Sequence, residues 1–319
     1  MKAAIHERYG LPNVLETKEV NKPIPKDNEI LVKVYAATLN RTDCAIISGK
    51  PDIIRLSEGL IKPANKFSGT DFAGEIEAVG SSVNTYKVGD RIFGFDDKGL
   101  KSHAQYITIS ENKPISVIPS DISYEQAVAS LEGAHYANNF INKVDLHDGD
   151  KVLVNGATGA IGSAVVQLSK YFGATITAVC RGEDFDLVMS LGASKVIDYL
   201  KDDFTTTYER YNYVFDAVGK SSFLKCKPLL QTGGTYISSE LGWMAQNVFF
   251  ALLKPVIGNK KVIFPFPSNI DATIKLISKL IEQGKFKAVI DREYPLGEIA
   301  DAYEYALSGQ KKGNVIIKM

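Results

Sequence analysis

The N-terminal part of the chain alternates apolar and polar residues with a period of two. This is the spacing of a strand with one buried face. The strands predicted from it cover residues 29–36, 74–79, 91–95 and 104–109. Because they are short and separated by Gly, Asp, Asn and Pro, they predict a small barrel-like β domain up to about residue 118. Residues 40–49 and 51–63 lack either regular period, so we expect loop or irregular helix there.

From residue 123 the pattern changes to short apolar runs that alternate with stretches of helical spacing. The runs predict strands at residues 151–155, 175–180, 195–198, 213–216 and 235–238. Helical spacing covers residues 123–142, 160–172, 184–190 and 222–230. Strands that alternate with helices form a parallel, doubly wound sheet. Gly233-Gly234 is interpreted as a turn before the fifth of these strands.

After residue 239 the pattern is less regular. It predicts a strand at 261–264, a helix at 270–283 ended by Gly284, a strand at 289–294, a helix at 296–308 and a strand at 314–318. The strand at 261–264 is apolar and is expected at the edge of the sheet, where a strand can pair with its copy. Together with Phe249, Phe250, Phe264 and Phe266, it favours a homodimer.

Composition narrows the range of partners. The chain has 319 residues, with 37 basic and 37 acidic side chains, so it carries no net charge. A balanced charge predicts no nucleic-acid partner and no anionic membrane partner. The N-terminus has no targeting pattern, and the apolar stretch 248–257 is interrupted by Lys254 and Pro255. Three cysteines that are far apart favour a reducing, cytoplasmic compartment over a disulfide framework.

A glycine-rich turn stands between the predicted strand at 151–155 and the helix that follows. Its residues are Gly156, Ala157, Thr158, Gly159, Ala160, Ile161 and Gly162. Glycine allows the backbone to approach a pyrophosphate, and a helix N-terminus offers free N–H groups to it. A tight turn with close helix–strand packing would use glycine in the same way. The flanking strand, helix and second strand favour a dinucleotide site over the turn alone.

The end of the second strand of this unit indicates which dinucleotide binds. An NAD site usually has an acidic residue there, and this chain has Cys180 followed by Arg181. A neutral thiol leaves room for the 2′-phosphate of NADPH, and a guanidinium can bind it. Glu183 and Asp184 are evidence against this, unless they cap the following helix, and Arg181 as a solvated surface charge is the alternative. We expect NADPH.

Several motifs in one order give the chain a family resemblance. They are Asn40-Arg41-Thr42-Asp43, Gly69 to Gly74, Val88 to Gly94, the glycine-rich turn, Leu191-Gly192-Ala193, Asp216-Ala217-Val218-Gly219 and Lys312-Gly313-Asn314-Val315. In this order the chain resembles the zinc-independent quinone-oxidoreductase branch of the medium-chain dehydrogenase/reductases. The resemblance implies a GroES-like domain of β-barrel type and a Rossmann domain with a doubly wound parallel sheet, with the active site between them. The implied boundaries are 1–120 with 266–319, and 121–265.

The resemblance also assigns cofactor contacts outside the glycine-rich turn. They are Tyr199, Ala217, Val218, Gly219, Ser238, Ser239 and Asn314. Trp243, in the loop after residue 238, is expected to border the nicotinamide pocket.

Two positions distinguish the chain from the zinc alcohol dehydrogenases of the same superfamily. Those enzymes have a cysteine ligand at the position of Asn40 and a histidine ligand at the position of Thr70. An amide and a hydroxyl do not form a zinc site, so we expect no metal. His103 and His135 are expected to be packed or surface histidines rather than ligands.

Without zinc, an isolated ketone is poorly polarised, whereas a quinone or an α,β-unsaturated carbonyl spreads the developing charge by conjugation. The substrate class expected is therefore a quinone or enone, and Asn40 and Thr70 are the candidate catalytic hydrogen-bond donors. Asp43 is expected to hold the Asn40 loop rather than to donate a proton, and Glu132 receives no role.

Other functions stay open at this point. A zinc-free alcohol or carbonyl dehydrogenase would use the same cofactor site. A nucleotide-binding protein with little turnover would also have the glycine-rich turn. The sequence does not identify the proton donor of the reaction.

Overall fold

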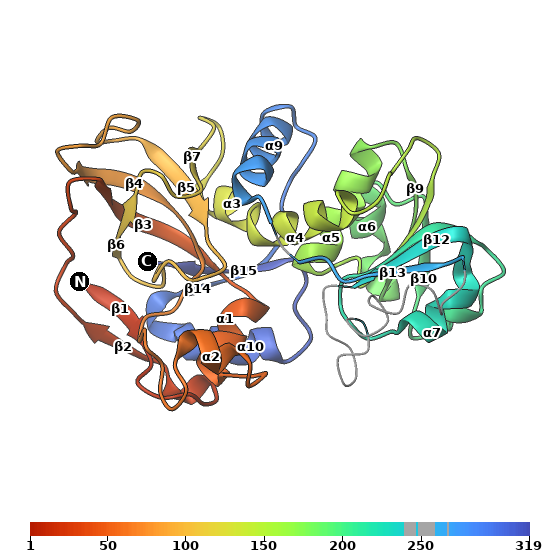
Figure 1. The fold of residues 1–319 in the computed structure, drawn as a ribbon, viewed down its shortest axis with the longest axis horizontal. Coiled ribbons are helices and arrows are strands. Elements are labelled where there is room, and N and C mark those ends of the chain that lie inside the picture. Colours follow the sequence, from red (N-terminus) through yellow and green to blue (C-terminus); the bar gives the residue numbers. More distant parts are fainter. Residues whose placement is uncertain (239–246, 248–258, 267) are drawn as a thin grey trace. The chain divides into compact units, whose positions relative to one another are not determined.

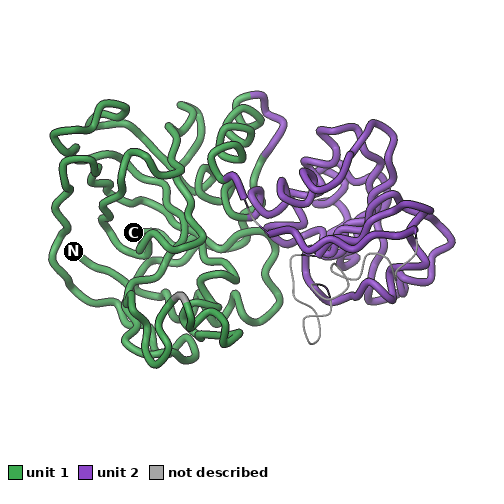
Figure 2. Tube along the Cα trace, in the orientation of Figure 1, with its two compact units in different colours: residues 1–132, 270–282, 287–319 green, residues 133–269, 283–286 purple. Residues whose placement is uncertain are grey.

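The computed structural model describes residues 1–238, 247, 259–266 and 268–319 (Figure 1). They form two compact units (Figure 2): unit 1 contains residues 1–132, 270–282 and 287–319, and unit 2 contains 133–269 and 283–286. The boundaries between the units fall after Glu132 and before Ile270. The predicted domain boundaries fall after residue 120 and before residue 266. Unit 2 is therefore nearly continuous in sequence, whereas unit 1 is not.

Unit 2 is built on a parallel sheet. Its strands are β8 (Lys151–Asn155), β9 (Thr175–Cys180), β10 (Lys195–Asp198), β11 (Tyr211–Asp216), β12 (Leu230–Ser238) and β13 (Lys261–Ile263). In space their order is β10-β9-β8-β11-β12-β13, and all five pairings are parallel. This is the strand order of a dinucleotide-binding sheet, which confirms the predicted doubly wound fold. The expected edge position of β13 is also confirmed within the described residues.

Helices connect these strands. They are α5 (Ala160–Tyr171), α6 (Phe185–Ser190) and α7 (Phe223–Cys226), whereas α4 (Glu132–Ile141), which begins at the last residue of unit 1, precedes β8. Short 3-10 turns at Gly182–Asp184 and Lys227–Leu229 replace parts of the helices predicted at 184–190 and 222–230. A third 3-10 turn, Phe204–Thr206, lies between β10 and β11. The buried face of α5 packs against β8 and β9.

Two predictions in this region are wrong. The helix predicted at 123–142 is two helices, α3 (Tyr124–Ala129) and α4. They separate because Ser130 ends α3 and its hydroxyl donates to the Gln126 carbonyl, which competes with continued helix. The turn predicted at Gly233-Gly234 lies inside β12, where the pairing with β11 skips from Leu230 to Thr235.

Unit 1 contains a sheet of seven described strands and a two-stranded pair. The large sheet has β3 (Glu29–Leu39), β4 (Asp71–Val79), β5 (Arg91–Phe95), β6 (Tyr106–Ser110), β7 (Ile115–Val117), β14 (Ile290–Pro295) and β15 (Asn314–Lys318), in the order β14-β15-β3-β4-β5-β7 with β6 on β3. β1 (Lys2–Ile5) pairs with β2 (Glu16–Glu19). The sequence pattern misses β1, β2 and β7, which are four residues or fewer in length.

The helices of unit 1 include two that the sequence pattern predicts as irregular. They are α1 (Arg41–Ser48) and α2 (Ile54–Glu58). The other described helices of unit 1 are α3, α9 (Ile270–Glu282) and α10 (Ile299–Leu307), and 3-10 turns lie at Pro12–Val14 and Leu296–Glu298. Asn40 is the N-cap of α1 and has extended backbone, and the Asp43 carboxylate accepts the Asn40 backbone N–H at 2.9 Å. An N-cap with an acidic third residue stabilises a helix that is too short to show a clear apolar period.

The antiparallel pairing of β15 with β3 matches Val315 to Leu39 and Ile316 to Thr38. Both strands are buried, and with Tyr303, Ile299 and Ile47 they form one apolar cluster. This pairing places the segment before β15 beside the carboxyl end of β3, where Asn40 lies.

Candidate active site

The glycine-rich turn joins β8 to α5 in unit 2. Gly156 follows the last residue of β8 and has a φ of +79°, and Gly159 is the N-cap of α5. A Cβ on Gly162 would lie closer to the Gly156 carbonyl than real Cβ atoms ever do, and one on Gly156 would lie 2.8 Å from the Val218 side chain. The fold itself therefore requires glycine at 156 and 162.

Gly159 differs from Gly156 and Gly162 because packing within the chain does not require glycine there. This position therefore shows whether the turn has room for a dinucleotide. A Cβ there would meet nothing nearer than 3.6 Å, and the backbone of Gly159 is extended. Its missing side chain is thus not explained by packing within the chain. It leaves space at the N-terminus of a twelve-residue helix, where a pyrophosphate fits.

The strand register brings the other predicted cofactor residues of unit 2 to one edge of the sheet. Asp198 pairs with Cys180, Asn155 with Val179 and with Asp216, and Asp216 with Ser238. The carboxyl ends of five neighbouring strands therefore align. Directly after them come Arg181, Tyr199, Gly156 and the turn Ala217–Gly219.

Asp216 holds the turn that follows β11. Its carboxylate is buried and accepts hydrogen bonds from the backbone N–H groups of Val218, Gly219 and Ser221. It also accepts from the Asn155 amide and the Tyr236 hydroxyl. This carboxylate is therefore a structural group that fixes residues 217–219 beside the glycine-rich turn.

Arg181 and Tyr199 meet at the ends of β9 and β10. The Arg181 Nε donates to the Tyr199 hydroxyl at 3.0 Å, and its Nη1 lies 3.9 Å from a Glu183 carboxylate oxygen. Burial raises the pKa of the Cys180 thiol to about 12, so this side chain is neutral. The pair thus presents guanidinium and hydroxyl donors beside an uncharged residue, an arrangement that suits an added phosphate.

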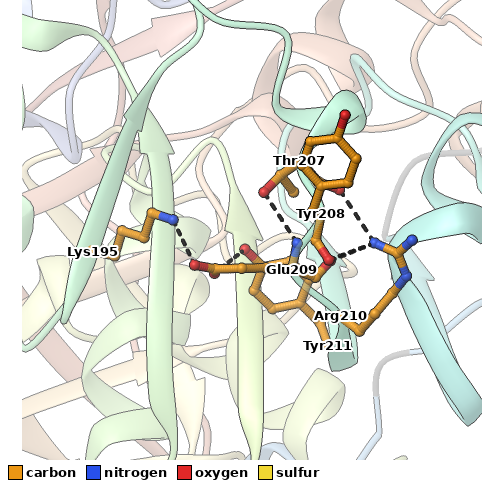
Figure 3. A network of polar contacts seen from close by, with 6 residues as sticks. All are labelled: Lys195, Thr207, Tyr208, Glu209, Arg210 and Tyr211. Carbon is orange, nitrogen blue, oxygen red and sulfur yellow. Dashed lines mark hydrogen bonds and ion pairs between the residues drawn. The ribbon is translucent and has the colours of Figure 1, made fainter.

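The opposite edge of the sheet has a different polar network (Figure 3). Lys195 begins β10, and its ammonium contacts Glu209 at 2.6 Å. Tyr211 begins β11 and donates to the same carboxylate, while Arg210 donates to the carbonyls of residues 207–209. Because these residues lie at the amino ends of β10 and β11, they are far along the strands from the glycine-rich turn and have a structural role.

In unit 1, Asn40 and Thr70 lie in a buried polar cluster. The Asn40 amide donates to the Thr38 hydroxyl, which in turn donates to the Asp71 carboxylate, and Asp71 also accepts the Thr38 backbone N–H at 2.7 Å. Asn40, Thr70 and Asp71 are all almost fully buried. The buried Thr70 hydroxyl interacts with the Asp43 carboxyl, and this interaction opposes the effect of burial on the pKa of Asp43.

Carboxyl groups surround this cluster. Asp43 is fully buried, and burial raises its pKa to about 7. Burial likewise raises the pKa of Asp71 to about 7 and that of Glu132 well above its ordinary value, and Asp43 raises both further. The Thr42 hydroxyl donates to Glu132 at 2.7 Å, so α1 and the start of α4 share one acidic site.

Asp43 both holds the Asn40 loop and is a buried acid, two roles that the sequence presents as alternatives. It holds the N-terminus of α1, as predicted, and it is also a buried acid with a raised pKa. Two further side chains of the site carry no sequence signal of their own: Glu132, and Lys311, whose Nζ lies 3.3 Å from the Asn40 Oδ1. The available signal for Lys311 is its position just before the Lys312-Gly313-Asn314 motif.

Two of the histidines are packed, as expected. His103 is buried between the Ser68 hydroxyl and the Thr38 carbonyl, and burial lowers its pKa to about 4. His135 is also buried, with its pKa lowered to about 4 by burial. Within the described residues, no group of three or more His, Cys, Asp and Glu side chains has the arrangement of a metal site.

The remaining predicted residues lie elsewhere. Asn314 is buried in unit 1, at the start of β15, and its amide donates to the Val289 carbonyl at 3.0 Å. Ser238 ends β12, whereas Ser239, Trp243, Phe249 and Phe250 fall outside the described residues. Among the described helices, none is both long and apolar enough to cross a membrane.

Comparison with known proteins now defines the class. Residues 26–120 match the alcohol dehydrogenase GroES-like domain, and residues 191–317 match the family described as zinc-binding dehydrogenase. The chain belongs to the medium-chain dehydrogenase/reductase superfamily. Within it, the chain is quinone oxidoreductase-like.

Individual relatives agree with this assignment. The chain is 30% identical to the chloroplastic NADPH-dependent alkenal/one oxidoreductase of Arabidopsis thaliana, over 99% of this chain and 79% of that protein. It is 30% identical to the chloroplastic quinone-oxidoreductase homolog of Spinacia oleracea, over 97% and 95%. The Escherichia coli quinone oxidoreductase in complex with NADPH has the same fold, with a TM-score of 0.83, 22% identity and complete coverage of both chains.

The glycines of the turn give a first prediction. Gly162→Ala should lower the free energy of unfolding by about 1–3 kcal/mol because its Cβ meets backbone. Gly159→Ala should cost less than about 1 kcal/mol yet weaken NADPH binding, because only a ligand fills that space. Chemical denaturation and NADPH titration measure the two effects, with Gly297→Ala as the control because its Cβ would meet nothing within 4 Å. Unchanged NADPH affinity of Gly159→Ala would contradict the site.

The buried carboxyls give a second prediction. Asp71 has an ordinary pKa of 3.8 that is raised to about 7 in the folded chain, so the folded state keeps a proton that the unfolded state loses. Its stabilising contribution is therefore complete below pH 3.8 and is lost as the pH rises to about 7. Over this pH range the free energy of unfolding of Asp71→Asn should fall less than that of the wild type. The free energy of unfolding of the exposed Asp52→Asn variant should fall as much as that of the wild type. Equal slopes for Asp71→Asn and the wild type would show that Asp71 is not a buried acid.

Proposed function

We propose that this chain is an NADPH-dependent oxidoreductase that transfers hydride to a quinone or an α,β-unsaturated carbonyl without zinc. The observation that carries the cofactor assignment is the alignment of the glycine-rich turn with the Arg181–Tyr199 pair at one sheet edge. The names of the relatives from Arabidopsis thaliana and Spinacia oleracea support the substrate class. A bound NADPH would supply the hydride, and the chain supplies orientation and hydrogen bonds.

The residues of each unit have distinct roles in this proposal. The N-terminus of α5 binds the pyrophosphate, and Arg181 with Tyr199 binds the 2′-phosphate of the adenosine. Residues 217–219 and Ser238 follow or end neighbouring strands of the same sheet edge, and with Ser239 they are assigned to the nicotinamide end of the cofactor.

The oxygen of the substrate requires donors because no zinc polarises it. The Asn40 amide has two N–H groups, and Thr38 accepts one of them. The second N–H can donate to the substrate oxygen, and the Thr70 hydroxyl can do so when it turns away from the Asp43 carboxyl. Asn40 and Thr70 are amide and hydroxyl side chains, which supports hydrogen bonding over metal ligation.

Edge strand β13 supports a homodimer. It ends the described sheet, and the following Phe264 and Phe266 rings contact each other with 5.0 Å between centroids, although Phe266 is 68% exposed. Light scattering in solution, with Phe266→Ser as the variant, tests this assembly.

The activity is tested by NADPH oxidation with a panel of quinones, enones, aldehydes and simple ketones. We expect turnover with conjugated acceptors and much slower turnover with simple ketones. Turnover confined to alcohols or aldehydes would favour a dehydrogenase of that class. Tight NADPH binding without oxidation by any acceptor would favour a nucleotide-binding protein with little turnover.

Cofactor preference gives a third prediction. Arg181→Ala should weaken NADPH binding by about 10- to 100-fold, the effect of losing a charge-assisted hydrogen bond, and should leave NADH binding within about twofold. Dissociation constants for both cofactors measure this. Arg210→Ala is the matched control because it removes a guanidinium at the opposite edge of the sheet. Tighter NADH than NADPH binding in the wild type would overturn the assignment.

A further inference from the structure

The proton that completes the reduction requires a source, and unit 1 contains a candidate outside the motifs. Lys311 precedes β15, and the pairing of Val315 with Leu39 holds its segment beside the end of β3. Its Nζ lies 3.3 Å from the Asn40 Oδ1 and 3.4 Å from the Leu39 carbonyl. The Lys311 ammonium thus donates a hydrogen bond to the amide side chain that we propose as the donor to the substrate oxygen.

The charges around Lys311 come from several elements. α1 contributes Asp43, Arg41 and the neutral thiol of Cys44, α4 contributes Glu132, and β4 contributes Asp71. Burial lowers the pKa of Lys311, and the carboxylates of Glu132 and Asp43 oppose that shift, while Arg41 adds to it. A lysine with a lowered pKa gives up its proton more readily than an exposed one.

The carboxyls can replace the proton that Lys311 loses. Because burial raises the pKa of Asp43 to about 7, this carboxyl holds a proton for part of the time at neutral pH. Lys311 itself is half-buried, whereas Asp43 and Glu132 are buried. A proton can therefore pass from water to the cluster at Lys311 without exposing the acids.

An unpartnered acid oxygen indicates that this cluster is built for a ligand. The Glu132 Oε2 is buried and has no hydrogen-bond partner among the described residues, whereas the buried Thr70 hydroxyl interacts with the Asp43 carboxyl. Buried polar atoms without partners are costly and are rare outside functional sites. In this acidic cluster, which also holds Asn40 and Lys311, the Glu132 oxygen can accept a hydrogen bond from a polar group or water.

We propose that Lys311 is the proton donor of this site and that the Asp43–Glu132 carboxyls return a proton to it. This inference rests on the proposed function. When hydride has reached the β-carbon of an enone, the electrons of the C=C bond move toward the carbonyl oxygen and leave an enolate. One N–H bond of Lys311 then breaks as a C–H or O–H bond forms on the enolate, and the resulting amine takes a proton from the carboxyl pair. Water returns that proton, so one hydride and one proton are consumed in each turnover.

The two substrate classes should depend differently on Lys311. Reduction of a quinone leaves charge on a phenolate-type oxygen, which water protonates readily. Reduction of an enone leaves an enolate whose carbon is protonated slowly without an acid. The loss of Lys311 should therefore slow enone reduction more than quinone reduction.

The fourth prediction is that Lys311→Met lowers kcat for an enone by about 100-fold or more, the range of general acid catalysis. It should lower kcat for a quinone by less and leave the NADPH dissociation constant within about twofold. Lys311→Arg keeps the charge and the contact with Asn40 but does not release a proton near neutral pH, so it should be as slow as Lys311→Met. Lys275→Met, an exposed lysine on α9, is the matched control and should keep wild-type activity.

The pH profile separates proton donation from a structural role. Wild-type kcat with an enone should fall as the pH rises and Lys311 loses its proton, and this fall should be absent from Lys311→Met. Wild-type activity in Lys311→Met or Lys311→Arg, or an unchanged pH profile, would overturn the inference while leaving the proposed function intact. If the wild type does not oxidise NADPH with any of the acceptors, both the inference and the proposed function are overturned.

Discussion

The antiparallel pairing of β15 with β3 is the contact on which the organisation of unit 1 depends. The two strands come from opposite sides of unit 2 in the sequence, and their pairing joins these parts of the chain into one sheet. The same register brings Lys311 to Asn40 and the apolar side of α10 to that of α1. An amide at the end of β3 would otherwise lie among carboxyl groups with no lysine nearby.

The two units collect polar groups by different physical means. In unit 2, parallel strands end at the same edge, so residues that follow each strand meet without any special side-chain contact. In unit 1, the polar groups meet inside the protein, where burial rather than position controls their protonation. Asp43, Asp71 and Glu132 therefore differ in chemistry from the exposed acids of the same unit, although their sequence positions are unremarkable.

The sequence is sufficient to predict the alternating strands and helices of unit 2 and the sheet edge at which we propose that the cofactor binds. The strand and helix periods predict β8 to β12, and the glycine-rich turn is located from its own residues, because these signals are local. The break at Ser130 and the short helix α1 are missed because single side-chain contacts decide them. Asn40 and Thr70 are reached only through a resemblance, and Lys311 and Glu132 are not reached at all. Their burial and their partners depend on a pairing between distant strands, which no local pattern records.

The discontinuity of unit 1 also constrains the order in which the chain can fold. Synthesis delivers all six strands of the described unit 2 sheet before it delivers β15. Unit 2 can therefore form from neighbouring segments, whereas unit 1 must wait for a pairing of high sequence separation, which is intrinsically slow. Until β15 arrives, Asp43 and Glu132 have no lysine beside them, and the edge of β3 that pairs with β15 is open to water. The newly made chain thus passes through a stage with an unpaired, apolar strand edge, which is the state in which chaperones bind and aggregation begins.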